Sequence, residues 1–386
     1  MANTIDATLV DRIYAMGLTA LRKKTSLLRN ITRYDRNVDT PSFRGDTLVI
    51  PMPGEVEDAT DVVPSNTPPV PGDITPGYAS ITLNQHKKTD FHLTDVEVSK
   101  LQAGTMSSHF TSAIDKLAKN IVQNVWGNYT GIYQYAGTVG TTPFASNISI
   151  ATTARKILNN AGVPMEDRSL IMNFDAEANA LQLSLFQQYL QKGDTETLRE
   201  GMIYRAMGMD WETDAYLPTF TGGTLSNGST KSALINSAAV TVGQTSVPMD
   251  SATLTGTVIA GDLFTVAGDD QQYVVTANAT AAGNAITVSF DPPAKVAWAD
   301  NAVVTFVANH DVAAIAMHPE AFAFASRRLD NIVFHGGNMI RSMYDPASGL
   351  TLTLEISRQY HQTVAEFSCL WGSTLMRPEC AVRILG

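Results

Sequence analysis

GDTLVIPMPGEVEDATDVVPSNTPPVPGDITPGYASITLNQH, residues 45–86, is the stretch that determines the predicted fold. It contains seven of the chain's 17 prolines, six acidic residues and no Lys or Arg. Its two ends, Thr47–Ile50 and Ser80–Leu83, alternate apolar and polar residues as strands do. The proline-rich middle excludes a helix and cannot donate sheet hydrogen bonds. The pattern therefore predicts a two-stranded finger with an acidic tip, standing away from any core.

Such a finger has no obvious support within its own chain. A segment of about forty residues with this composition cannot bury enough apolar surface to order itself. It needs a surface to lie on, and no other part of the sequence obviously offers one. We therefore expect the finger to lie on another copy of the same chain.

A long amphipathic helix follows the finger. Thr94–Asp95 can cap its start. Apolar residues then recur every three or four positions and define one stripe: Met106, Phe110, Ile114, Leu117, Ile121 and Val125. The helix should end near Trp126–Gly127, and a helix of about thirty residues is roughly 45 Å long. One apolar stripe on so long a helix predicts a sheet packed along it.

Length and composition indicate an ordered protein with large buried surfaces. A chain of 386 residues should form two or three structural units, and 44% of it is hydrophobic against 17% charged. The two cysteines, Cys369 and Cys380, do not make a disulfide framework, which favours a reducing compartment. The sequence has no long apolar run and no N-terminal apolar stretch with a cleavage site, so we expect neither a membrane span nor secretion by the usual route.

The net charge of −10 argues against a protein that grips DNA phosphates or reads DNA sequence. The charge is uneven, because residues 1–40 carry seven basic and four acidic residues. Two interpretations stay open. The basic N-terminal arm can pair with the acidic finger of a neighbouring copy, or the helix predicted at 4–24 simply has a solvated basic end.

The middle of the chain predicts an α/β body interrupted by a small β domain. Helices are expected at 150–161 and 175–191, a buried strand at Ser169–Asn173, and a brief helix at 194–200. From 222 the composition shifts to Gly, Ala, Thr and Val, and short apolar runs recur between turns: Ala239–Val242, Leu254–Ile259, Leu263–Val266, Tyr273–Thr276, Ile286–Phe290 and Val303–Val307. This spacing predicts a small barrel or sandwich, inserted as residues 222–308.

The chain after 309 returns to the α/β body. It predicts a strand at Ala313–Met317, a helix opening at Pro319, and a loop at Gly336–Gly337. Three further strand-like runs close the chain: Leu350–Arg358, Thr363–Leu370 and Ala381–Leu385. The last of these should return to a core.

The sequence shows none of the common catalytic motifs: no Gly-x-Ser-x-Gly, no phosphate loop, no dinucleotide fingerprint and no paired Cys-x-x-Cys. His310, His318, His335 and His361 make a metal site conceivable, but their spacing favours structural histidines. Asp269–Asp270 fits a tight turn better than a Ca²⁺ site. Four aromatic residues fit core or subunit packing better than base stacking: Trp126, Tyr129, Tyr133 and Tyr135. Lys87 and Lys88 fit solvated charge better than cross-linking. We therefore expect no enzyme activity, cofactor or metal.

The order of these elements carries a resemblance to a known family. The stretches that carry it are FRGDTLVIPMP and ITLNQHKKTDFHLTDVEVS around the finger, LAKNIVQNVW, GDLFTVAGDDQQYVVT, IAMHPEAFAFASRRL, and LWGSTLMRPECAVRILG at the end. Together they resemble the major capsid (coat) proteins of tailed double-stranded DNA bacteriophages, which have the Hong Kong 97 shell fold, and among them the short-tailed-phage coat proteins with an insertion domain. The resemblance spans essentially the whole chain.

The resemblance implies an α+β fold with the following division: an N-terminal arm at 1–40, an extended finger (E-loop) at 41–95, a spine helix of the peripheral domain at 96–127, a peripheral and axial body at 128–221 and 309–386, and an inserted β-barrel domain at 222–308. It implies a structural protein that assembles through hexamers and pentamers into an icosahedral head around a double-stranded DNA genome, without sequence-specific binding. A scaffolding protein and a portal protein are the implied partners, decoration proteins are left open, and assembly would take place in the host bacterial cytoplasm before the protein resides in the virion.

The candidate contact residues lie on the finger and the arm. For contacts between subunits we select four finger acids, Glu55, Glu57, Asp58 and Asp61, and five basic arm residues, Arg22, Lys23, Lys24, Arg29 and Arg33. Family members with covalent cross-links use a Lys in the finger, and the distal part of this finger has none. We therefore expect no cross-link.

Three other classes of protein are weighed against this one. The nearest is an encapsulin-like bacterial nanocompartment shell, which shares the fold but would package protein and would need a cargo-peptide groove. An enzyme with an appended β module would need a nucleophile or a carboxylate pair in a cleft. A tail or adhesion protein would form rods or tubes instead of spheres.

Overall fold

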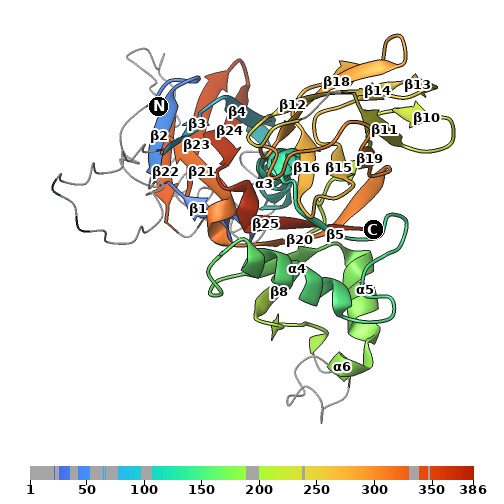
Figure 1. Ribbon diagram of the computed structural model, residues 1–386. Helices are drawn as coiled ribbons and strands as arrows, with labels where there is room; N and C mark the ends of the chain where they lie inside the picture. Colours follow the sequence, from blue (N-terminus) through green and yellow to red (C-terminus); the bar gives the residue numbers. More distant parts are fainter. Residues whose placement is uncertain are drawn as a thin grey trace.

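The computed structural model describes residues 21, 26–34, 42–52, 64, 66, 77–96, 107–187, 200–236, 240–329, 339–346 and 348–386. In this part of the chain the fold is α+β and rich in strands, as the sequence predicts. It consists of two sheets with a few helices, which we call the body, a closed barrel, and a two-stranded hairpin (Figure 1). The hairpin and the barrel lie at opposite sides of the body.

The first sheet of the body has six strands in the order β1-β21-β24-β23-β22, with β4 also paired to β24. The strands are β1 Thr32–Arg33, β4 Gln85–Thr94, β21 Phe322–Arg327, β22 Met339–Asp345, β23 Leu350–Gln359 and β24 Gln362–Leu375. The fourteen residues of β24 are central, because β4 pairs along one edge while β23 and β21 share the other.

The second sheet has seven strands in the order β5-β25-β20-β6-β8-β7, with β9 paired to β20. The strands are β5 Tyr135–Gly137, β6 Ser169–Met172, β7 Arg205–Ala206, β8 Met209–Thr213, β9 Thr219–Phe220, β20 His310–Met317 and β25 Ala381–Leu385. Both β6 and β25 are buried along their whole length. Helices α4 Ser149–Asn160 and α5 Phe174–Gln182 lie on one side of this sheet, and the short α6 Ser184–Gln187 follows (Figure 1).

Helix α3, Ser107–Gly127, is the described part of the long predicted helix. The predicted stripe is confirmed where it is described, because Ile114, Leu117, Ile121 and Val125 are all buried. A polar contact fixes the helix to the six-stranded sheet, since the Asn124 side-chain oxygen accepts from Trp371 Nε1 and Ser373 Oγ, each at 3.1 Å. The expectation of a sheet packed along the helix is therefore confirmed. A 3₁₀ turn, η2 Asn128–Gly131, follows the helix.

The barrel closes in the order β11-β12-β18-β16-β15-β19. Its strands are β11 Ser232–Ile235, β12 Ser246–Asp250, β15 Leu263–Val266, β16 Gln272–Val275, β18 Ala285–Asp291 and β19 Val303–Phe306. Two small ladders accompany it: β10 Ser226–Asn227 with β13 Leu254–Thr255, and β14 Thr257–Val258 with β17 Ala279–Thr280. The barrel has a core separate from the body core, and contacts among Phe264, Tyr273, Phe290 and Trp298 run through it.

The predicted finger strands pair as expected. Strand β2, Thr47–Met52, runs antiparallel to β3, Gly77–Thr82, with Thr47 opposite Thr82. The expectation that the finger stands away from any core is wrong at its base. Ile81 and Leu83 are fully buried, together with Ala323, Ala325 and Leu370 of the six-stranded sheet. These apolar side chains give the hairpin a support within its own chain.

Several local predictions are also wrong. The helix expected at Pro319 is one 3₁₀ turn, η3 Pro319–Ala321, and the alternating AFAFAS that follows is strand β21, buried throughout because it lies between other layers. The helix expected at 175–191 is interrupted at Leu183, whose backbone is extended. Residues 85–94, assigned to the finger, form β4 in the sheet.

Other predictions fall outside the described residues. These are the loop at 336–337, His335, and almost all of the helices expected at 4–24 and 194–200. Strands β11, β12 and β22 were not predicted. The domain boundaries drawn from the sequence stay a prediction.

Candidate functional site

The two sheets of the body are joined by a pair of matching turns. Strand β20 continues through η3 into β21, and β24 continues through η4 Pro378–Cys380 into β25, so each connection passes from one sheet to the other. The sequences match as Met317-His-Pro-Glu-Ala321 and Met376-Arg-Pro-Glu-Cys380. The backbone contacts also match, because His318 N donates to Cys380 O at 3.0 Å and Arg377 N donates to Ala321 O at 3.2 Å. The sequence analysis missed this pair, although the shared pattern Met-x-Pro-Glu could have revealed it.

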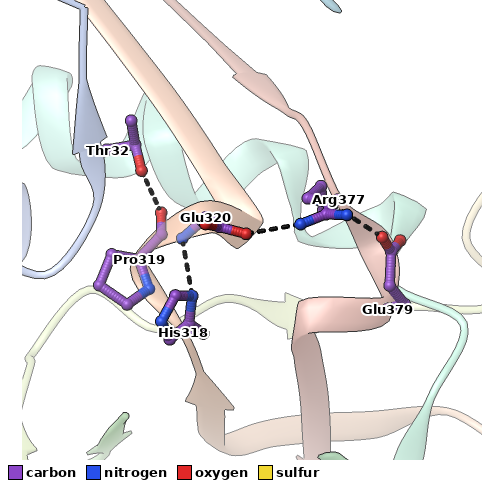
Figure 2. A network of polar contacts seen from close by, with 6 residues as sticks. All are labelled: Thr32, His318, Pro319, Glu320, Arg377 and Glu379. Atoms are coloured by element: carbon purple, nitrogen blue, oxygen red, sulfur yellow. Dashed lines mark hydrogen bonds and ion pairs between the residues drawn. The ribbon is translucent and has the colours of Figure 1, made fainter. Parts of the chain in front are cut away.

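Arg377 binds the acids of both turns (Figure 2). Its Nη1 is 2.6 Å from Glu320 Oε2 and its Nε is 3.2 Å from Glu379 Oε1. The hydrogen bond to Glu320 raises the pKa of Arg377, which keeps the guanidinium charged. In the same network Thr32 Oγ1 of β1 donates to Pro319 O at 2.9 Å. This contact ties the start of the described chain to the crossing between the sheets.

A second polar contact region joins the barrel to the body. Gln272 of the barrel strand β16 binds the backbone of Tyr135 on β5 twice: Tyr135 N donates to Oε1 at 2.7 Å, and Nε2 donates to Tyr135 O at 3.0 Å. Buried Arg383 of β25 donates from Nη1 to Gly261 O at 3.1 Å and from Nη2 to Thr130 O at 2.7 Å. Arg383 therefore links the C-terminal strand, the turn before β15 and the 3₁₀ turn after α3.

The barrel contact is also apolar. Leu263 and Val274 of the barrel are buried with Leu385 of β25, and Tyr133 and Tyr135 pack against them. Trp126 and Tyr129 are buried in the body core, where Trp126 meets Phe322 edge-to-face and Tyr129 meets Phe220. The expectation that these four aromatic residues serve packing is confirmed.

The structure describes two of the five basic arm residues that were selected for contacts between subunits, Arg29 and Arg33. Arg29 is exposed and its charge acts on Glu212, whose Oε2 accepts from Asn30 Nδ2 at 2.8 Å. Arg33 Nη1 donates to Pro346 O at 3.1 Å. Both arginines thus lie on the body of their own chain, and a contact with another copy stays a prediction. The remaining candidates lie outside the described residues: Arg22, Lys23, Lys24, Glu55, Glu57, Asp58 and Asp61.

The hairpin β2–β3 exposes one mixed face to solvent, on which Val49 and Tyr78 lie among the polar residues Thr47, Ser80 and Thr82. Leu48 and Ile50 turn toward the body and are half-buried, whereas Val49 is 53% exposed and Tyr78 is 66% exposed. Side chains alternate between the two faces of a strand, so the exposed residues share the outer face. An exposed aromatic and a β-branched residue on one paired face are typical of a protein–protein contact.

The tip of the β23–β24 hairpin carries a second exposed aromatic residue. Tyr360 is 89% exposed. Beside it Asp95 binds Arg358, and His361 Nδ1 lies 3.5 Å from Asp95 Oδ2. The hydrogen bond from Arg358 lowers the pKa of Asp95. The ion pairs hold the turn against the end of β4, so Tyr360 is presented on an ordered tip.

The residues considered for metal or covalent chemistry have structural roles. Within the described residues no group of three His, Cys, Asp or Glu side chains is placed to hold a metal ion. Asp269 Oδ2 accepts from Tyr273 at 2.6 Å and from Trp298 at 2.9 Å, which confirms a turn. Lys88 pairs with Glu366 across β4 and β24 at 2.8 Å. Cys369 and Cys380 are buried free thiols.

Two hollows remain. A cleft of about 790 Å³ lies between α4 and the barrel and is lined by residues of both charges, among them Lys156, Lys295, Asp270 and Glu379. A smaller pocket of about 280 Å³ contains Glu177 and Glu212, and burial raises the pKa of both carboxyls. Neither lining includes a His or Cys. The smaller pocket thus brings together two of the carboxyls that an enzyme of this kind would need.

None of the described helices has the length and apolar character needed to cross a membrane. No family model matches the sequence. No curated protein matches it either.

The chain is similar to solved structures of viral shells. One is the capsid of the cyanophage P-SCSP1u, at 13% identity and a TM-score of 0.47, covering 92% of this chain and 86% of that one. Another, from Mycobacterium phage Che8, has 12% identity and a TM-score of 0.45 and covers 91% and 90% of the two chains. A virus-like particle from Pyrococcus furiosus has 11% identity and a TM-score of 0.41 and covers 97% and 98%.

Proposed function

We propose that this chain is a shell-forming protein, which assembles with copies of itself into a closed particle. The observation that carries the proposal is the hairpin β2–β3. One face rests on the chain's own sheet through Ile81, while Val49 and Tyr78 on the other face are open to solvent. The strands are joined by a long acidic, proline-rich segment, 53–76. Extended arms of this kind enlarge the contacts between subunits, and repeated contacts that close by rotation produce shells.

More particularly, we propose the major capsid protein of a tailed double-stranded DNA phage, with the Hong Kong 97 arrangement. In this assignment β2–β3 is the E-loop and α3 is the spine helix. The six-stranded sheet with α3 is the peripheral domain, and the seven-stranded sheet is the axial domain. The barrel is the inserted domain, since body strands precede and follow it in the chain.

The partners follow from this proposal. Copies of the chain would form hexamers and pentamers, guided by a scaffolding protein and completed by a portal protein at one vertex. The enclosed DNA would not be gripped by specific contacts, which agrees with the net charge of −10. The shell would have no catalytic role, and the virion would form in a bacterial cytoplasm.

The test is expression of the full chain, alone and with its scaffolding protein, followed by electron microscopy of the products. Closed uniform spheres or capsomers support the proposal. A stable monomer in both preparations would refute it. Rods or tubes would point to a tail or adhesion protein.

An encapsulin-like shell is the closest alternative within the same fold. It would package protein, whereas a phage capsid packages DNA. Nuclease-protected DNA in purified particles from infected cells supports the phage assignment, and a co-purifying protein cargo without DNA supports the alternative.

The pocket with Glu177 and Glu212 provides a specific test for the enzyme alternative. Glycoside hydrolysis uses two carboxyls, one kept protonated by a raised pKa and one ionised. Burial raises the pKa of both Glu177 and Glu212, so the pocket offers a candidate acid but no clearly ionised partner. A glycosidase panel with the wild type and a Glu177→Gln variant decides the question. We expect no turnover in either sample, and activity lost in the variant would overturn the non-enzymatic assignment.

A further inference from the structure

The contact region between barrel and body contains buried polar atoms that find no hydrogen-bond partner among the described residues. His310 opens β20, the first body strand after the barrel, and only 5% of its surface is exposed. Its Nδ1 lies 2.8 Å from Ala308 O. A carbonyl oxygen can only accept, so Nδ1 carries the proton and Nε2 is the unprotonated nitrogen. Among the described residues neither His310 Nε2 nor Arg383 Nε finds a hydrogen-bond partner.

The charges around His310 are unbalanced. Arg383 is completely buried on the neighbouring strand β25, and none of the described residues forms an ion pair with it. Its guanidinium lies over the Tyr129 ring at 5.2 Å and the Phe220 ring at 5.9 Å, and the Phe220 ring is 5.3 Å from the His310 ring. A second positive charge here would be desolvated and close to the first, which is costly.

Two acids and one lysine face the same region. Asp262 of the barrel is buried, but its oxygens already accept from the backbone of Gly223 at 3.1 Å and Ile259 at 2.8 Å. Asp311, next to His310, is exposed. Lys231 spans the two chain connections of the barrel, donating to Gly223 O at 2.8 Å and to Asn309 Oδ1 at 3.2 Å. Asp262 is committed to the turn, so it is poorly placed to neutralise a protonated His310.

We infer that the contact between barrel and body is a pH-sensitive hinge, in which protonation of His310 at Nε2 weakens the attachment made by Arg383 and Gln272. The hinge is at a suitable place, because the barrel has its own core and is joined to the body through this region. Opening would expose Nε2 and Arg383 to water without unfolding either part. Proteins open locally in cooperative units, and a buried polar group without a partner is a cost that opening to water would relieve.

The link between protonation and stability predicts how the contact between barrel and body changes with pH. Burial, followed by the nearby charge of Arg383, lowers the pKa of His310, while Asp262 and Asp311 oppose this. We call the state with barrel and body in contact the closed state. A histidine whose pKa is lowered in the closed state stabilises that state at pH values above its ordinary pKa of about 6.5. This stabilisation is lost as the pH falls to the lowered pKa. Burial raises the pKa of Asp262, so its effect on the closed state has the opposite sign. Between the ordinary and the lowered pKa of His310, opening should rise by up to about tenfold per pH unit.

Hydrogen exchange of the full chain tests this, with rates corrected for the intrinsic effect of pH and the assembly state held constant by light scattering. The reporter is the peptide containing Tyr135, whose amide donates to Gln272 across the hinge. Peptides within β18 and β23 report on the barrel and body cores. Between pH 7.5 and 5.5 we expect the protection of the Tyr135 peptide to fall by about tenfold. The two core peptides should not change.

Three variants isolate the histidine. His310→Asn keeps a donor for Ala308 O but does not titrate, and should make the Tyr135 peptide insensitive to pH. His361→Asn, at the exposed β23–β24 tip, is the matched control and should behave like the wild type. Asp311→Asn removes an exposed acid that raises the pKa of His310, so the midpoint should move to lower pH.

The wild type and Asp311→Asn keep the inference testable even if His310→Asn fails to fold. A wild-type reporter that is insensitive to pH would overturn the inference. So would an unchanged pH dependence in His310→Asn, its loss in His361→Asn, or an unchanged midpoint in Asp311→Asn. The inference concerns the isolated fold and does not depend on shell assembly.

Discussion

At the residue scale, Gly261 shows how closely the barrel approaches the body. Its φ is +99°, which an L side chain rarely adopts. An added Cβ would lie 2.9 Å from a Phe220 ring carbon and 3.1 Å from Thr130 Cβ. Both the backbone conformation and the contact therefore require a glycine at this turn.

Gly261→Ala is expected to lower the free energy of unfolding by about 2–4 kcal/mol, adding backbone strain to overpacking. Gly268→Ala is the matched control, because Gly268 has φ +89° but no atom within 4 Å of the added carbon. Its free energy of unfolding should fall only by the cost of the backbone strain, about 1–2 kcal/mol. Denaturant titration of both variants measures the difference, and equal losses would show that the contact with Phe220 and Thr130 is unimportant.

The two cysteines allow a second prediction at this scale. Burial raises the pKa of Cys369 to about 12 and that of Cys380 to about 11. The thiolate is the reactive form, so neither thiol should react with a disulfide reagent at pH 8 while the protein is folded. Colorimetric titration should detect two thiols only after denaturant is added. Rapid labelling of the native protein would contradict the buried positions of both side chains.

At the element scale, the two faces of the hairpin β2–β3 make different contacts, one within the chain and one in the proposed assembly. The inner face, with Ile81, belongs to the fold, and the outer face, with Val49 and Tyr78, is free for assembly in the proposed function. The two roles can be separated experimentally because the residues alternate along the same strands.

Val49→Asp combined with Tyr78→Ser should leave the unfolding transition of the unassembled chain nearly unchanged. Loss of a buried interfacial aromatic costs about 2 kcal/mol or more, so the concentration needed for assembly should rise at least about tenfold. Light scattering against concentration measures this. Val242→Asp, at a barrel position that is 64% exposed, is the control. Unimpaired assembly of the double variant would exclude the outer face as a contact.

The elements also show what a sequence can predict. Helix α3 and strand β25 have unambiguous apolar patterns, and both were predicted correctly. Strand β4, QHKKTDFHLT, consists mostly of polar residues. Its backbone pairs with β24 and one of its faces is exposed to solvent, so it can be a strand without an apolar composition. The turn at Pro319 resembles the start of a helix, since Pro and Glu are common in the first helical turn. The alternating residues that follow it form strand β21 instead.

The polar contact regions were beyond sequence reasoning. Arg383 lies within the apolar run AVRIL, and nothing local shows that Gly261 and Thr130 will receive its hydrogen bonds. Those partners are set by tertiary structure, more than 120 residues away in the chain. The finger and arm residues were selected for contacts between copies. The structure of a single copy cannot contain such contacts, so their selection depends on the proposed assembly.

At the scale of the whole molecule, the uneven charge distribution allows us to test the proposed contacts between copies. The finger segment is acidic, while the N-terminal arm is basic in a chain with a net charge of −10. Charges of opposite sign on two segments of different copies guide association, and the effect weakens with salt.

Replacing Glu55, Glu57, Asp58 and Asp61 with Lys should therefore weaken assembly more than folding. The yield of particles should fall most at low salt, where the screening length is long. Electron microscopy gives the yield, and circular dichroism checks the fold. A normal particle yield from the quadruple variant would rule out the acidic finger as a contact.

The position of β25 has a consequence for synthesis of the protein. The last strand of the chain lies inside the seven-stranded sheet, between β5 and β20, and is buried along its length. Domains fold as they are synthesised from the N-terminal side, so this sheet cannot be completed until residues 381–385 have emerged from the ribosome. The barrel strands 232–306 are contiguous in the chain and can form earlier. A nascent chain would therefore carry a finished barrel beside an unfinished body until β25 has been synthesised.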